Sequence, residues 1–435
     1  MKKDNTGSQA KQAGKVGKGR VTPINKYSRR FIATSVLELG VLAAIEKLAD
    51  FFEEDVLQLV GVDRYQRGDK RTASRYGSTM GQLPLGGQKL KVMRPRVRMD
   101  GKEVTLPTYE HFSAKEQLDE RALRQVVAGV ASRRYKSSLE TDGISDDTFG
   151  ASKSALSRRF VAITAKKLDE WLARRLDGEE YLVIMIDGIN LGESVVIAAL
   201  GITVDGYKKV LGTWEGATEN AVVCQMLLND LVQRGLDPTI SRLFVLDGAK
   251  ALHKAVHDTF GKRAKVQRCQ IHKIRNVKQH LPKELHASVE QAMRQAYKSS
   301  ELKTAQKLLQ NLAHGLKDGH PRAASSLEEG LDETLTVIAM DLPSGLRRLL
   351  ASTNSSENIN ATLRSATGNV KRWRNGRMVM RWVATGFIYA ERRLRRLYGH
   401  TNLLVLRDRL LANDQELDKD KKVAAAATAV KKAAA

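Results

Sequence analysis

Residues 181–188 read YLVIMIDG, and residues 242–248 read RLFVLDG. Each stretch is a short apolar run that ends in an Asp-Gly pair, a pattern that predicts a buried strand with an aspartate at its tip. We therefore expect two buried strands that carry Asp187 and Asp247 at their ends. These aspartates lie far apart in the chain, but two strand tips can meet at one edge of a sheet.

The segments around these runs complete the expected sheet. Residues 194–203 and 207–214 have strand character, and Asp205-Gly206 between them suits a tight turn. Three consecutive strands joined by tight turns predict an antiparallel meander, and a helix over 220–236 would bring the next strand back parallel to the first. A second helix and the short strand KVQRC follow. This order is typical of an α/β protein with a ribonuclease-H-like core.

A third acid suits the same site. Glu357 lies in STNSSENIN, whose Ser, Thr and Asn residues are typical of a helix start. Carboxylates with open coordination positions are the ligands that Mg²⁺ needs for phosphoryl transfer. We expect two Mg²⁺ ions, replaceable by Mn²⁺: Asp187 would bridge both, Asp247 would hold the ion that activates the nucleophile, and Glu357 would complete the second. The nearby acids that compete for these roles are Glu193, Asp205 and Glu215.

Basic residues dominate the charge of the chain. Its 435 residues include 73 Lys and Arg against 49 Asp and Glu, which gives a formal net charge of +24. An excess this large favours polyanions and predicts salt-sensitive binding through counterion release. Aromatic residues make up 5% of the chain, so we expect contacts with the phosphates of double-stranded DNA rather than stacking on single-stranded bases. The alternative is a merely basic or ribosome-associated protein.

Two further features bear on where the protein acts. No run of about 18 apolar residues occurs, so we expect no membrane span and no membrane partner. The basic start of the chain lacks the apolar stretch of a secretory signal. Two cysteines, Cys224 and Cys269, are too few for a disulfide scaffold and fit a reducing cytoplasm.

Composition and periodicity divide the chain into eight segments. We expect a basic disordered arm at 1–30, N-terminal helices at 31–66, a small β-containing module at 67–114, a helix-turn-helix DNA-binding region at 115–178, the first part of the ribonuclease-H-like core at 179–272, an all-α insertion at 273–350, the final core helices at 351–412, and a low-complexity tail at 413–435. The arm carries nine Lys and Arg against one acid, the next segment has the periodicity of a helical pair, and the tail would be a frayed helix at best.

The β-containing module is predicted from alternation. Residues 90–99 and 102–109 alternate like short strands on either side of a turn at Asp100-Gly101. Arginines would then line one face of this module, namely Arg94, Arg96 and Arg98.

The DNA-binding region is predicted from two helical patterns. Residues 123–140 and 152–176 have helical periodicity around the turn-rich stretch TDGISDDTFG. Ser152 would cap the second helix, and the residues near its exposed start are of types that contact phosphates and base edges. They are Lys153, Ser154, Ser157, Arg158 and Arg159. The alternative is a charged surface helix in a linker bundle.

Basic residues also follow Glu357. Arg364 lies seven residues beyond it and would face the same side of the helix. Positive charge beside the acids would hold donor DNA and stabilise a developing phosphorane. The further basic residues are Lys371, Arg372, Arg374, Arg377 and Arg381, and the first four of these are expected to contact DNA. Trp373 lies among them and would either pack into the core or stack on a flipped base.

Cys269 and His272 form a C-x₂-H pair. A zinc site usually needs four ligands, and His253 and His257, four residues apart on the preceding predicted helix, are the available additions. Since the chain holds a single C-x₂ unit, we do not expect zinc. We expect a buried cysteine and a histidine close to the active site.

Taken together, these segments resemble the Mutator-type transposases of bacterial insertion sequences, which are members of the DDE superfamily. The likeness runs from about residue 60 to 410, and the segments that carry it are PRVR, GKEVTLPTYEHFS, SKSALSRRFV, MIDG, GITVDGYKKVLGTWEGATEN, VLDGAKAL, VQRCQIHKIRNV, STNSSEN and NVKRWRNGRMVMRW. The resemblance implies a ribonuclease-H-like core interrupted by a helical insertion, with catalytic acids at Asp187, Asp247 and Glu357. It also marks residues 216–220 as a signature, in which Thr218 is a candidate helix cap.

The acids, the charge and the resemblance lead to one expected function. We expect a DDE transposase that binds the terminal inverted repeats of an insertion sequence, cleaves DNA to give a 3′-hydroxyl, and transfers that strand into target DNA. It would act on element ends and target DNA as a homodimer or larger assembly, in the bacterial cytoplasm and associated with the nucleoid. The rivals are a catalytically silent DNA-binding protein and a branched-DNA nuclease, both of the same fold.

Overall fold

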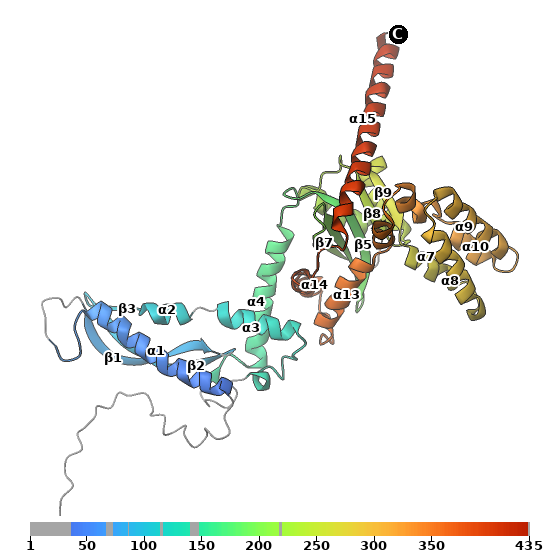
Figure 1. Ribbon diagram of the computed structural model, residues 1–435. Coiled ribbons are helices and arrows are strands. Elements are labelled where there is room, and N and C mark those ends of the chain that lie inside the picture. Colours follow the sequence, from blue (N-terminus) through green and yellow to red (C-terminus); the bar gives the residue numbers. More distant parts are fainter. Residues whose placement is uncertain are drawn as a thin grey trace, which may run out of the picture. The chain divides into compact units, whose positions relative to one another are not determined.

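The computed structural model describes residues 36–66, 73–85, 87–113, 116–139, 148–216 and 220–433. The chain forms two compact units, one that comprises residues up to 126 and 130–160, and one that comprises residues 127–129 and 161–435 (Figure 1). The predicted basic arm at 1–30 and the candidate cap Thr218 lie outside the described residues.

A helix packed on a β-hairpin forms the core of the first unit. Its elements are α1 (Val36–Val60), β1 (Ser74–Leu85), β2 (Gln88–Met99), β3 (Lys102–Val104), α2 (Pro107–Ser113), α3 (Glu116–Val127), η3 (Lys136–Ser138), β4 (Thr148–Phe149) and the start of α4 (Lys153–Leu172). The predicted helical pair at 31–66 is wrong, because α1 is a single helix of 25 residues. Leu48, Phe52, Val56 and Val60 recur every four residues and bury one continuous stripe against the hairpin.

The turn predicted at Asp100-Gly101 is confirmed. Both residues have positive φ, 50° and 78°, and Met99 pairs with Lys102 across them, as a two-residue hairpin turn requires. The second predicted strand is shorter than expected, since the chain leaves the sheet after Val104 and α2 follows. The strand β1 lacks a clear alternation and was not predicted.

The helix-turn-helix prediction differs from the structure in its connection. The helix α3 ends at Val127 rather than at 140, and residues 128–152 separate it from α4. This connection contains η3 and β4, which pairs with β2, and it is far longer than the three- or four-residue turn of the motif. The Ser152 cap is confirmed, because its hydroxyl accepts a hydrogen bond from the Ala155 N–H at 3.2 Å.

A five-stranded mixed sheet forms the centre of the second unit. Its strands are β5 (Tyr181–Leu191), β6 (Ser194–Thr203), β7 (Lys208–Gly216), β8 (Arg242–Leu246) and β9 (Ala264–Arg268), in the order β7-β6-β5-β8-β9. The pairs β5–β6 and β6–β7 are antiparallel, and β5–β8 and β8–β9 are parallel. The predicted meander and the predicted parallel return strand are both confirmed.

Helices cover both faces of this sheet. Along β5, Val183, Met185 and Ile189 point into one core, and Ile184 and Ile186 point into the other. The second core is closed by α5 (Ala221–Gln233) and α6 (Lys250–Phe260), and the first by α4 and by helices from later in the chain. Burial on both faces explains why the strands read as nearly continuous apolar runs.

The segment predicted as an all-α insertion contains helices and no strand among the described residues. It contains α7 (Gln270–Lys278), α8 (Lys283–Lys298), α9 (Leu302–Leu316), α10 (Pro321–Glu328), η5 (Asp332–Leu335), α11 (Thr336–Ala339) and α12 (Ser344–Leu350), and α7–α10 gather beside the β8–β9 edge of the sheet (Figure 1). The buried Gln267 side chain of β9 holds it there, because it donates to Thr334 O at 2.8 Å and accepts from Val337 N at 2.9 Å.

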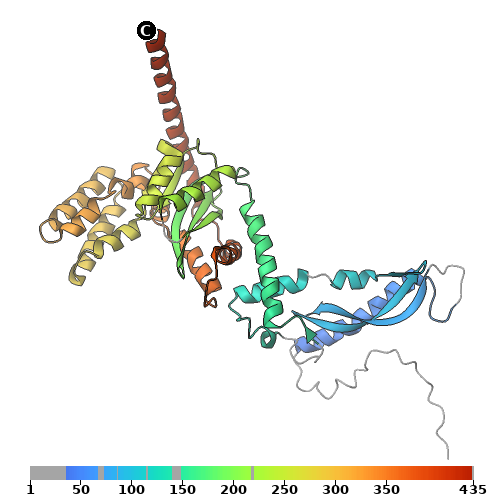
Figure 2. The ribbon, with the colours of Figure 1, turned by 180° about the vertical axis from the view of Figure 1, so that it is seen from behind.

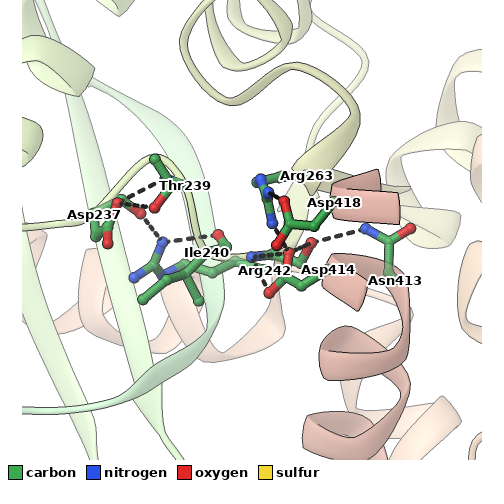
Figure 3. A network of polar contacts seen from close by, with 9 residues as sticks. Asp237, Thr239, Ile240, Arg242, Arg263, Asn413, Asp414 and Asp418 are labelled. Atoms are coloured by element: carbon green, nitrogen blue, oxygen red, sulfur yellow. Dashed lines mark hydrogen bonds and ion pairs between the residues drawn. The ribbon is translucent and has the colours of Figure 1, made fainter. Parts of the chain in front are cut away.

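The chain ends in α13 (Asn354–Thr367), α14 (Gly376–Glu391), η6 (His400–Asn402) and α15 (Leu403–Ala433). The segment predicted as a low-complexity tail is helical to Ala433, because α15 continues through it and projects past the sheet (Figure 2). Asp414 accepts from Ser241 N at 3.1 Å and pairs with Arg263, which also binds Asp418 (Figure 3). In the described part of the chain, no helix has the length and apolarity to cross a membrane.

Both units share α4. Its first part buries Leu156 and Phe160 in the first unit, and its second part buries Leu168 and Trp171 in the second. The helix continues without interruption from Phe160 to Val161, where one unit ends and the other begins.

Candidate active site

The first acid, Asp187, is buried in the sheet, with 8% of its surface exposed. It lies four residues before the end of β5 and pairs with Ala198, so the prediction of a strand tip is wrong for this residue. The pairing of β5 with β8 ends one residue earlier, at Ile186. The Asp187 Oδ1 accepts from the Gly188 N–H at 3.1 Å.

The second acid, Asp247, follows the last residue of β8 directly, so its predicted place at a strand tip is confirmed. Its Oδ1 accepts from the Ala249 N–H at 3.0 Å, which fixes the carboxylate at the start of the turn into α6. Since β8 is parallel to β5, both aspartates lie toward the carboxyl ends of neighbouring strands.

The third acid, Glu357, lies in the first turn of α13, as predicted. Its Oε1 is 3.6 Å from His272 Nε2 and 3.4 Å from Arg275 Nη1, both on α7. The glutamate therefore faces two basic side chains of α7.

The three acids share one electrostatic environment. Burial raises the pKa of Asp187 to about 6, and the negative charges of Asp247 and Glu357 add to the rise while His272 opposes it. Each of these groups thus lies close enough to influence the Asp187 carboxylate. The structure brings together acids from two strands and one helix that are separated by up to 170 positions in the sequence.

Cys269 and His272 lie beside this site, as predicted. Cys269 is buried and free, and its sulfur accepts from the Thr353 hydroxyl at 3.6 Å. Interaction with the Cys269 sulfur raises the pKa of His272 to about 9, against the effect of burial, and the Asp187 and Asp247 charges add to the rise. His272 is therefore a cation at neutral pH. His253, a candidate zinc ligand, pairs instead with Glu333 at 2.9 Å.

Sequence reasoning missed two residues of the site. Asn360, one turn after Glu357 on α13, is 3% exposed and donates through Nδ2 to Asp187 Oδ2 at 2.8 Å. Arg275 contacts Glu357 from α7. The spacing of Asn360 from Glu357 on one helix was the available signal, although an Asn at that spacing is also common on solvent-exposed faces.

Comparison with known proteins decides the family. A family model described as "Transposase, Mutator family" matches residues 35–392, which is most of the chain. The chain belongs to the Mutator family of transposases. A Staphylococcus aureus protein, the transposase for insertion sequence element IS256 in transposon Tn4001, is 25% identical over 351 residues, covering 76% of this chain and 86% of that protein.

Other relatives of this transposase chain are of the same kind. The transposase for insertion sequence element IS6120 of Mycolicibacterium smegmatis is 30% identical over 227 residues, covering 50% of this chain and 68% of that protein. The transposase for insertion sequence element IS1081 of Mycobacterium tuberculosis is 26% identical over 350 residues, covering 77% and 79%. The predicted family is thus confirmed.

The donor set of this transposase suits a hard divalent cation. All three acids offer oxygen ligands, and burial of Asp187 disfavours its charge until a cation stands beside it. Within the described residues, no three His, Cys, Asp or Glu side chains are gathered tightly enough to hold one metal ion. Glu357 is paired with His272 and Arg275 in this arrangement.

The candidate residues predicted after Glu357 fall into four places. Arg364 is exposed near the end of α13, two turns beyond Glu357. Trp373 packs against the core and against Gly192, where a Cβ atom would lie 2.6 Å from its ring, so core packing is the alternative that the structure favours. Arg381 is partly buried and donates to Thr164 at 3.3 Å. The remaining residues are exposed around the α13–α14 connection, at Lys371, Arg372, Arg374 and Arg377.

The predicted DNA contacts on α4 differ in exposure. The exposed residues are Lys153, Ser154, Ser157 and Arg158. Arg159 is half-buried and donates to the Gly150 carbonyl oxygen, and it also contacts Tyr135. Arg159 therefore stabilises the fold of the first unit and is the weakest of the five candidates for DNA contact.

Proposed function

We propose that the protein cleaves DNA at the ends of an insertion sequence and joins the resulting 3′-hydroxyl to target DNA, with Asp187, Asp247 and Glu357 as catalytic acids. The observation that carries this proposal is the geometry of three elements: β5 and β8 pair in parallel, and the Asn360–Asp187 hydrogen bond ties α13, which carries Glu357, to β5. Family membership supports the transposase activity, and the strand order β7-β6-β5-β8-β9 with its helical insertion supports a ribonuclease-H-like core.

The acids would hold two Mg²⁺ ions, for which Mn²⁺ could substitute, and bound Mg²⁺ supplies Lewis-acid stabilisation of charge on the phosphate oxygens. Asp187, fixed by Asn360 and Gly188, would orient the site from a rigid strand. His272, a cation at neutral pH, would add positive charge where negative charge develops.

The chemistry would proceed in two displacements. In the first, the oxygen of a water molecule forms a bond to phosphorus while the bond to the 3′-oxygen breaks, which leaves a 3′-hydroxyl and a 5′-phosphate. In the second, that 3′-hydroxyl attacks a target phosphodiester and releases the 3′-oxygen of the target strand. The exposed basic residues of α4 and of the α13–α14 connection would hold the duplexes on which both steps act.

The proposed reaction also implies an oligomeric state for the protein on DNA. Two element ends must be joined to one target, so a homodimer or larger assembly on DNA is expected. The terminal inverted repeats would provide the sequence-specific binding sites, and the bacterial nucleoid would be the place of action.

The test compares wild type with Glu357→Gln on labelled duplexes that carry the element ends. We expect cleavage and joining by the wild type with Mg²⁺ and none with EDTA, and a loss of at least about 10³-fold in the variant, because an amide is a poor ligand for a hard cation. End binding should stay nearly unchanged.

Glu193→Gln is the matched control, because Glu193 is a nearby exposed acid in the β5–β6 turn. It should cleave like the wild type. A variant at Glu357 that retains activity would show that this glutamate is not a ligand, and tight binding without products from the wild type would favour the catalytically silent alternative.

A further inference from the structure

An arginine-rich loop follows α14, and none of its residues is among the DNA contacts predicted from the sequence. Residues 392–398, here called the arginine loop, read RRLRRLY, and the family match ends at its first residue. Arg392, Arg393 and Arg395 are exposed, and Tyr398 exposes 87% of its surface. A large exposed aromatic among arginines is unusual for a surface whose only partner is water.

The arginine loop is held in place by the β6–β7 turn. Leu397 is buried, and its N–H donates to Gly206 O at 2.8 Å. The Arg396 guanidinium donates to the Asp205 carbonyl oxygen and lies 5.1 Å from the ring centroid of Tyr207. These contacts fix the backbone of the loop, so its exposed side chains project from a defined surface.

Positive charge on this surface is largely uncompensated. Asp205 offers a carboxylate 3.9 Å from Arg396. The Glu391 carboxylate is turned away from the loop, toward Arg174 and the Val210 N–H. Within the part of the chain that the structure describes, no ion pair engages the three exposed arginines at 392, 393 and 395.

The arginine loop lies at the opposite end of the sheet from the acids. The start of α14, at Gly376, lies against the Glu215 carboxylate near the end of β7, and its last residue, Glu391, binds Val210 near the start of β7. The helix therefore runs the length of the strand. The turn that holds the loop adjoins the start of β5, six residues before Asp187, which corresponds to roughly 20 Å along the strand.

We propose that the arginine loop binds the phosphate backbone of double-stranded DNA at a place separate from the catalytic acids. This inference rests on the proposed function for its partner. Guanidinium groups match phosphate geometry in paired hydrogen bonds, and an exposed tyrosine hydroxyl is a common phosphate donor. A spacing of roughly 20 Å corresponds to about six base pairs of duplex, so the loop would hold DNA beyond the cleavage position. A second copy of the chain is a poorer partner, because each copy carries a net charge of +24.

The experiment compares two variants of the full-length chain, each of which loses three positive charges at a different place. The test variant is Arg392→Gln/Arg393→Gln/Arg395→Gln, and the matched control is Lys303→Gln/Lys307→Gln/Lys317→Gln on the exposed surface of α9 and just after it. Binding is measured with a duplex that carries an element end and with an unrelated duplex of equal length, each over a range of salt concentrations. Both variants lower the net charge equally, so a difference between them reports position rather than total charge.

We expect the arginine variant to bind both duplexes about 10- to 100-fold more weakly than the wild type does. Its salt slope should be shallower by about 0.9 for each phosphate that the variant no longer neutralises. The lysine control should bind like the wild type.

The proposal is overturned if the arginine variant binds both duplexes with the affinity and slope of the lysine control. It is also overturned if self-association changes while DNA binding does not, because the loop would then be a contact between proteins. If the wild type binds but never cleaves, and the arginine variant still binds more weakly, the loop proposal stands while the proposed catalytic function fails.

Discussion

The neutral side chain of Asn360 fixes the carboxylate of Asp187, the most buried acid of the site, by a hydrogen bond. Asn360 donates to Asp187 Oδ2, and the Gly188 N–H donates to Oδ1, so both oxygens of one carboxylate have a fixed donor. Because Asn360 lies one turn from Glu357, the seating of α13 sets the positions of two acids at once. Asn360 is thus a positioning residue: it acts through Asp187.

Replacing Asn360 by Ala should weaken metal binding by about 10- to 100-fold, since a hydrogen bond to a charged group contributes about 1.5–3 kcal/mol. Cleavage should recover at high Mg²⁺ concentration. The measurement is Mn²⁺ binding followed by electron paramagnetic resonance, alongside cleavage against Mg²⁺ concentration. Asn358→Ala, at an exposed position on the same helix, is the control. Equal metal affinities in the two variants would remove the positioning role.

Asp187→Asn should stabilise the metal-free protein above pH 6 while abolishing cleavage. Burial raises the pKa of Asp187 to about 6 from the ordinary value of 3.8. The folded state therefore binds this proton more tightly than the unfolded state, and the acid destabilises the fold increasingly as pH rises from about 4 to 6. An amide avoids that cost, so we expect a gain of about 1–3 kcal/mol at pH 7.

Thermal unfolding in EDTA at pH 4 and pH 7 measures this effect. The gain should shrink toward zero at the lower pH, where Asp187 is protonated in the wild type. A variant that is less stable than the wild type at pH 7 would show that the buried charge is already compensated without a metal.

At the scale of elements, the long final helix is fixed to the sheet by a small polar network. The Arg263 side chain, 10% exposed, binds Asp414 and Asp418 one turn apart on α15, and Asp414 also accepts from Ser241 (Figure 3). Asn413 donates to the Ser241 hydroxyl at 2.8 Å. These contacts join α15 to the chain just before β8 and β9.

Asp414→Ala should lower the free energy of unfolding by about 2–3 kcal/mol, because it leaves the Ser241 N–H without its acceptor and Arg263 with only the more exposed Asp418 as partner. Urea denaturation measures the change. Asp420→Ala, exposed on the same helix, should stay within about 0.5 kcal/mol of the wild type. Similar losses in both variants would indicate that α15 is not anchored through Asp414.

The elements differed in how far the sequence revealed them. The strands of the five-stranded sheet were predictable, because burial on both faces leaves continuous apolar runs. The strand β1 was not, since Gly77, Gly81 and Pro84 interrupt its alternation. Gly81 has a packing reason, because a Cβ atom there would lie 2.6 Å from the Tyr109 ring. That reason depends on a residue distant in the chain and is invisible to local patterns.

At the scale of the whole molecule, contacts between distant parts of the chain also limited what the sequence could predict about the site. The three acids could be singled out from the sequence because two close apolar runs and one lies at a helix start, although Asp187 lies within β5 rather than at its tip. The bond between Asn360 and Asp187 was not predictable, because it joins positions 173 apart whose meeting depends on the packing of α13 on the sheet. Likewise, the inward turn of Arg159 toward Gly150 depends on tertiary contacts that a charge pattern does not contain.

The place of the helical insertion in the chain sets an order of events during synthesis. The last strand of the five-stranded sheet ends at Arg268, whereas Glu357 follows only after α7–α12. A ribosome that adds about 5–20 residues per second needs roughly 4–18 s to make the stretch between these two residues. A growing chain therefore holds every strand of the sheet, with Asp187 and Asp247 in it, for several seconds before the third acid exists. The length of the helical segment therefore sets the delay between synthesis of the last strand of the sheet and synthesis of Glu357.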